Sequence, residues 1–179
     1  RERSSTTMNV RRVAIKAERD LMKCYQSLSD LIDMTSEQLY HRYQVQANLK
    51  VRDMPFLMGQ GLYLDSDKLE QYDSIESVIK HGTLSVGFIG LAETLVALTG
   101  NHHGSSADAQ SLGEEIVAFM RNKMDKAMEK YGLNYSLLAT PAEGLSGRFV
   151  KMDRRIFGEI AGVTDKEYVS PPNVSKVNF

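Results

Sequence analysis

Apolar residues recur every three or four positions in two long stretches of the chain. The first covers residues 20–47, with apolar positions at Leu21, Tyr25, Leu28, Leu31, Ile32, Leu39 and Tyr43. The second begins at Ser106 or Asp108 and ends at Gly132, with an apolar face of Leu112, Ile116, Met120, Met124, Ala127 and Tyr131. This spacing predicts two long amphipathic helices. The methionines of the second are interpreted as adaptable core residues rather than a cofactor or partner site.

Shorter apolar runs alternate with further helical patterns. Residues 83–89 and 134–139 predict short buried strands, and residues 4–15 predict a strand that enters a helix. Short helices are expected over 73–80 and 91–99, the second ended by a glycine. Strands that alternate with helices indicate an α/β fold with parallel strands. No linker divides this pattern into two domains.

The stretch from residue 50 to 64 lacks a regular pattern. Pro55, Gly59 and Gly61 interrupt it, although much of the segment is apolar. We expect an irregular segment that packs against the protein and is shielded from water.

Composition narrows the functional classes. The 179 residues are 42% hydrophobic and 25% charged with a net charge of -1, which gives no reason to expect a nucleic-acid or membrane partner. No apolar run is long enough to span a bilayer and no secretion signal is recognisable, so a cytoplasmic protein is expected. The single cysteine, Cys24, excludes an internal disulfide framework and a cysteine-rich zinc site within the chain.

The string TPAEGLSGR, which follows the last predicted strand, fits a helix start. Thr140 stands at the cap, Pro141 at the first helical position and Glu143 three residues after the cap. The first N–H groups of a helix lack internal partners and lie at its positive pole, so they stabilise an anion, for which phosphate is the natural ligand. The alternative is that Thr140 and Glu143 satisfy each other's backbone and nothing binds.

The rest of this helix has two predicted faces. The solvent-exposed face is expected to carry Arg148, Lys151 and Arg155. The face toward the core is expected to carry Phe149, Met152 and Ile156. Two glycines, Gly144 and Gly147, indicate close approach of a ligand or a neighbouring strand to the backbone.

Three histidines, several further glycines and the cysteine are other candidate sites. His81, His102 and His103 lack the spacing of a metal site. Hydrogen bonds within their loop are the favoured interpretation of His102 and His103, and His81 is interpreted as ending the short helix before it, near the negative pole of that helix. The glycines of residues 82–100 do not form a dinucleotide fingerprint and are interpreted as structural. Cys24 lies on the apolar side of the first long helix and is expected to be a core residue.

Four long strings resemble the anaerobic, glycyl-radical (class III) ribonucleoside-triphosphate reductases. They are LNYSLLATPAEGLSGRF, FGEIAGVTDKEY, HRYQVQANLKVRDMPFLMGQGLYL and HGTLSVGFIGLAETLVALTGNHHG, and the similarity runs almost continuously from Thr7 to Tyr168. The resemblance implies that residues 1–168 form part of a ten-stranded α/β barrel. Residues 169–179, with Pro171 and Pro172, depart from the family pattern and are expected to be a tail.

The resemblance also implies a substrate site. The segment matching Thr140 to Ser146 holds the substrate phosphates in related reductases, which assigns phosphate binding to Thr140, Pro141, Ala142, Glu143, Gly144 and Ser146. Asn9 matches an asparagine that faces the substrate, in a family string Asn-Leu-Pro-Arg of which Val10 and Arg11 replace two residues here.

The family's radical machinery is missing from these residues. The resemblance implies a thiyl-forming cysteine, a glycyl radical installed by an iron–sulfur S-adenosylmethionine activase, and a structural zinc, all outside this segment. No cofactor is expected within the chain. The parent is expected to act on ribonucleoside triphosphates, with the activase as a partner and as a homodimer, while this chain alone is expected to be an inactive fragment.

Two other functions compete with this interpretation. One is a non-catalytic nucleotide-binding or assembly module derived from the reductase barrel. The other is a different glycyl-radical enzyme, such as a formate-lyase relative, which the TPAEGLSGR match disfavours.

Overall fold

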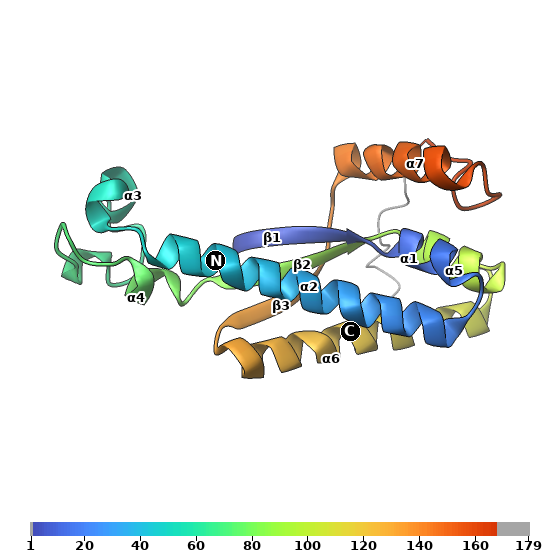
Figure 1. Cartoon of the computed structure of the whole chain (residues 1–179), viewed down its shortest axis with the longest axis horizontal. Coiled ribbons are helices and arrows are strands. Elements are labelled where there is room, and N and C mark those ends of the chain that lie inside the picture. Colours follow the sequence, from blue (N-terminus) through green and yellow to red (C-terminus); the bar gives the residue numbers. More distant parts are fainter. Residues whose placement is uncertain (1, 168–179) are drawn as a thin grey trace.

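A computed structural model describes residues 2–167 of the chain. Three parallel strands, β1 (Glu2–Asn9), β2 (Thr83–Ile89) and β3 (Asn134–Ala139), form one sheet in the order β1-β2-β3 (Figure 1). The predicted α/β fold with parallel strands is therefore confirmed. The expected tail at 169–179 lies outside the described residues.

Two long helices cover one face of the sheet. They are α2 (Leu21–Ala47) and α6 (Ala107–Tyr131), and both match the predicted helices (Figure 1). Asp20 caps α2 through the amide of Lys23, and Ser106 caps α6 through the amide of Ala109. Buried side chains from both helices and from alternate positions of the strands form the main core: Leu28, Ile32, Leu39, Met120 and Met124 with Met8, Val86 and Phe88. The prediction that the methionines of the second long helix are core residues is confirmed for Met120 and Met124.

Short helices occupy both ends of the sheet. At its carboxyl end, α1 (Val10–Ala17) follows β1 directly and α5 (Leu91–Thr99) follows β2 (Figure 1). At the other end are α3 (Pro55–Gly59) and α4 (Glu76–Ile79), with two 3-10 turns, Val51–Asp53 and Ser66–Lys68.

The segment from residue 50 to 64 is irregular as expected, but the expectation that it is shielded from water is wrong in part. Met58 is buried, whereas Phe56 is 70% exposed and Leu64 is 73% exposed. The short helix α3 has too few residues to turn all its apolar side chains inward.

Helix α7 (Glu143–Phe157) lies on the side of the sheet opposite α2 and α6 (Figure 1). Its predicted capping box is wrong, because the N-cap is Ala142, which makes no side-chain cap hydrogen bond. Thr140, directly after β3, continues the hydrogen bonding of the sheet, because its amide donates to the carbonyl of Phe88 at 3.2 Å. The helix therefore starts later than the local sequence predicts.

The predicted core face of α7 also needs correction. Met152 and Ile156 are 42% and 59% exposed, while Val150 and Asp153 are buried. A carboxylate faces inward here because a buried guanidinium, that of Arg11, pairs with it. The predicted solvent-exposed face is confirmed, since Arg148, Lys151 and Arg155 are exposed.

Candidate functional site

Two threonine hydroxyls meet above the central strand near the carboxyl end of the sheet. Thr7 on β1 and Thr140 after β3 lie on either side of Gly87 on β2, and their Oγ1 atoms are 3.1 Å apart. A β carbon at position 87 would collide with the Thr140 hydroxyl and lie 2.8 Å from the Thr7 hydroxyl. The absence of a side chain at Gly87 therefore allows this contact between strands that are not neighbours.

The same face of the sheet carries further hydroxyls. Ser85 and Ser136 lie on this face because side chains alternate along a strand, and their Oγ atoms are 3.0 Å apart. Ile89 closes the carboxyl end of the face by packing with Val150 of α7. The face opposite the main core is thus lined by hydroxyl groups up to the start of α7.

The start of α7 presents backbone donors at this edge. The amide of Ala142 donates to the carbonyl of Thr140 at 3.0 Å, and the amide of Ser146 makes the first bond of the helix with the carbonyl of Ala142 at 2.9 Å. The amides of residues 143–145 have no acceptor within the helix. Pro141 and Gly144 are exposed, and nothing lies within 4 Å of the position of a β carbon on Gly144.

Positively charged side chains lie along the exposed side of α7. Arg148, Lys151 and Arg155 line an open pocket of about 460 Å³ together with Gly144 and Gly147. Arg155 belongs to the last turn, so this pocket follows the exposed side of the helix and extends away from its positive pole. An anion at the start of α7 would meet the backbone donors of its first turn.

Asn9, predicted to face the substrate, lies in a buried ionic cluster. Its Nδ2 donates to Asp153 of α7 at 2.8 Å, and its Oδ1 accepts the amide of Arg12 as the cap of α1. The guanidinium groups of Arg11 and Arg12 bind the same carboxylate at 2.5 and 2.6 Å. The sequence does not predict that Asp153 binds Asn9, Arg11 and Arg12, because Asp153 lies more than 140 positions from each of them.

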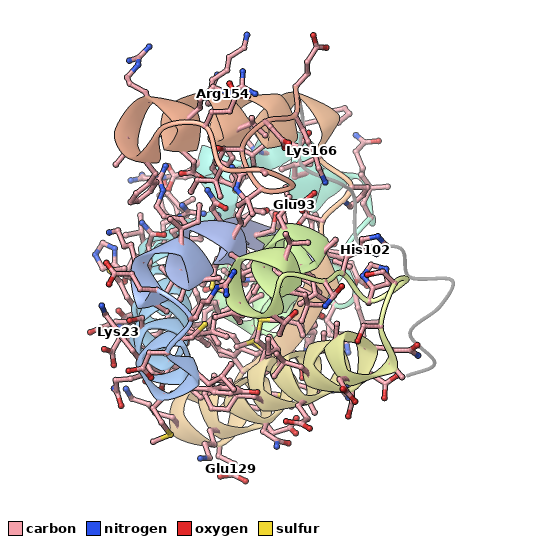
Figure 2. The ribbon with its side chains drawn as sticks, turned by 90° about the vertical axis from the view of Figure 1, so that its right-hand side faces the viewer. Lys23, Glu93, His102, Glu129, Arg154 and Lys166 are labelled. Carbon is pink, nitrogen blue, oxygen red and sulfur yellow. The ribbon has the colours of Figure 1, made fainter. Side chains whose placement is uncertain are left out.

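The segment after α7 folds back over α5. Arg154 donates to the carbonyls of Thr164 and Lys166, each at 2.7 Å, and Lys166 reaches the buried Glu93 at 3.0 Å. Figure 2 shows Lys166 directed toward Glu93 on α5, below Arg154. These contacts join the carboxyl end of α7 to the layer beneath it.

The single cysteine lies on the other side of the sheet from these hydroxyls. Cys24 is buried in the main core, on the face of the sheet opposite Thr7 and Thr140. Burial raises the pKa of its thiol. Its predicted role as a core residue is confirmed.

The described residues contain no group of three or more side chains that could bind a metal ion. The Nδ1 atom of His102 accepts the amide of Gly104 at 3.0 Å, as expected for a histidine that stabilises its own loop. Within residues 2–167, no helix combines the length and the hydrophobicity needed to cross a membrane.

Several curated proteins are similar to this chain. It is 31% identical over 165 residues to the anaerobic ribonucleoside-triphosphate reductases of Salmonella typhimurium and Escherichia coli, a match covering 90% of the chain and 23% of each relative. The enzyme with the same name from Enterobacteria phage T4 is 29% identical over 166 residues, covering 89% of the chain and 26% of the relative. The chain thus spans about a quarter of the length of these relatives.

Solved structures show the same fold. The anaerobic ribonucleotide reductase from Thermotoga maritima with citrate in the active site matches with a TM-score of 0.70 and 19% identity, over 93% of this chain and 28% of that one. The same enzyme in complex with dATP and CTP matches with a TM-score of 0.65 and 18% identity, over 93% and 26%. A sequence profile described as anaerobic ribonucleoside-triphosphate reductase matches residues 3–177. The chain therefore belongs to the anaerobic ribonucleoside-triphosphate reductase family.

Proposed function

We propose that this chain forms part of an enzyme that reduces ribonucleoside triphosphates to deoxyribonucleoside triphosphates, and that it holds the phosphates of the substrate. The family supports the reaction class. The phosphate-binding residues in this proposal are Thr140, Pro141, Ala142, Glu143, Gly144 and Ser146.

The uncapped start of α7 carries the proposal. The N-cap residue, Ala142, offers no side-chain acceptor, so within the described residues the amides of residues 143–145 are available to an anion at the positive end of the helix. Open space around Gly144 permits an oxygen atom to approach the backbone closely. A phosphate there would replace the capping side chain that the helix lacks.

The two threonines extend this anion site toward the sheet. The bond between Thr7 and Thr140 uses only one hydroxyl hydrogen, so the other is free to donate to a phosphate oxygen. Asn9 is the proposed substrate-facing residue of β1. Its Nδ2 gives one hydrogen to Asp153 and keeps a second for the substrate.

The radical chemistry is proposed to depend on groups outside the described residues. Cys24 is buried on the other face of the sheet and does not fit a thiyl radical carrier at this site. The described residues do not fit the zinc site of the family either. The family resemblance implies a glycyl radical, installed by an iron–sulfur S-adenosylmethionine activase, and a homodimeric parent.

In this proposal the 179-residue chain alone binds nucleotide without reducing it. A nucleotide-binding module derived from the reductase barrel would behave in the same way. Formation of deoxyribonucleoside triphosphates by the activated full-length gene product supports the enzyme, and binding without reduction by that product supports the module.

An NMR titration of the chain tests the phosphate site. Addition of a ribonucleoside triphosphate is expected to shift the amide resonances of residues 142–146, and inorganic triphosphate is expected to shift the same resonances. The corresponding ribonucleoside, which lacks phosphates, is the control and is expected to leave them in place. Shifts confined to other regions would reject the site.

A further inference from the structure

The carboxylate of Asp153 on α7 binds residues at the end of β1 and the start of α1. Its Oδ2 atom accepts hydrogen bonds from Asn9 Nδ2 at 2.8 Å, Arg11 Nε at 3.0 Å and Arg11 Nη2 at 2.5 Å. Its Oδ1 atom accepts a bond from Arg12 Nε at 2.6 Å. The side chains of Asp153 and Arg11 have no exposed surface. All three donor residues lie within four positions of one another at the junction between β1 and α1.

The carboxylate fixes which way the Asn9 side chain points. Asn9 Oδ1 caps α1 by accepting the amide of Arg12 at 3.3 Å, while Nδ2 is directed to Asp153. The two ends of the carboxamide therefore have different partners, and reversing it would place Nδ2 against an amide donor and Oδ1 against a carboxylate. Asp153 thereby selects one of the two orientations.

The same carboxylate is a main anchor of α7. The apolar contacts of this helix form a small cluster around Ile89 and Val150. Arg11 also donates to the carbonyl of Val163 at 3.4 Å, so the segment after α7 shares the anchor. Loss of one partner from a buried, hydrogen-bonded ion pair leaves an uncompensated charge, which makes such a pair costly to break.

We propose that Asp153 is a positioning residue for the substrate site, an inference that rests on the proposed function. It holds the Asn9 carboxamide in one orientation and fixes α7 against the sheet. The phosphate-binding start of α7 lies on the order of 15 Å along the helix from Asp153, at 1.5 Å per residue. One carboxylate thus sets the spacing between the group that faces the substrate and the group that binds its phosphates.

Amide hydrogen exchange of the chain without nucleotide tests the anchor. In Asp153→Asn, the amides of residues 146–150 are expected to exchange at least tenfold faster, while those of β2 keep their rates. The side-chain amide resonances of Asn9 are expected to move. Asp125→Asn is the matched control, because Asp125 is an exposed carboxylate of α6 whose partner Arg121 is 4.0 Å away. Equal acceleration in all elements, or unchanged exchange in α7, would overturn the anchor.

Arg12→Gln keeps the test decisive if Asp153→Asn does not fold. The Arg12 side chain is 27% exposed, and its removal leaves the contacts of Asn9 and Arg11 with Asp153 in place. We expect about threefold faster exchange in α7 and unchanged exchange in β2. Exchange equal to that of the unaltered chain would contradict the proposal.

Kinetics of the full-length gene product test the link to the substrate. Asp153→Asn is expected to raise KM for the ribonucleoside triphosphate about tenfold with a smaller change in kcat, whereas Asp125→Asn changes neither. An unchanged KM would overturn the positioning role. If the unaltered protein binds triphosphate away from α7, the proposed function fails, and hydrogen exchange still decides whether Asp153 anchors the helix.

Discussion

At the scale of single residues, the site depends on a side chain that is missing. Neighbouring strands lie about 4.8 Å apart, so residues on β1 and β3 are normally separated by the side chain between them. Gly87 removes that obstacle, and the hydroxyls of Thr7 and Thr140 meet above it. A glycine inside a strand usually weakens it, which makes its presence here informative.

The substitution Gly87→Ala tests this contact. Because the new β carbon would collide with the hydroxyl of Thr140, we expect a loss of about 1–3 kcal/mol in the free energy of unfolding. Urea denaturation measures it. Gly59→Ala is the control, since no atom lies within 4 Å of its β carbon position. The two variants having equal stability would contradict the account of Gly87.

At the scale of elements, helix ends follow local sequence only where local groups satisfy them. The cap Ser106 and the left-handed Gly132 bound α6 as the sequence predicts. Helix α7 does not follow its capping box, because the Thr140 amide continues the sheet and its hydroxyl binds Thr7. Contacts with residues distant in the sequence therefore determine where α7 begins.

The cap of α6 offers a measurable contrast. Ser106→Ala removes the bond from Ser106 Oγ to the amide of Ala109, so the free energy of unfolding is expected to fall by about 1 kcal/mol. Ser111→Ala, at an exposed position inside the same helix, is expected to be neutral or slightly stabilising. Thermal denaturation compares the two. A larger loss for Ser111→Ala would show that Ser106 is not the cap.

The sequence could predict the elements that carry their own periodicity. The bounds of β2 and β3, and of the helix around residues 20–47, agree with the apolar pattern. It could not predict that Asp153 faces inward, because its partner Arg11 lies 142 residues away. The rotation of α7, which exposes Met152 and Ile156, follows from that distant ion pair.

At the scale of the whole molecule, the two faces of the sheet have different chemistry. The face covered by α2 and α6 packs into an apolar core, which includes Cys24 of α2. The other face carries the hydroxyl pairs Thr7–Thr140 and Ser85–Ser136. Helix α7 lies on that side of the sheet (Figure 1). This division lets one side stabilise the fold while the other offers donors to a ligand. Since the chain spans about a quarter of its relatives, the proposed chemistry needs residues beyond these.

A structure of the protein in complex with a ribonucleoside triphosphate tests the central claim most directly. The account predicts phosphate oxygens within hydrogen-bond distance of the amides of residues 143–145, close to the hydroxyl of Thr140. A triphosphate bound elsewhere, with the start of α7 covered by protein groups, would contradict it.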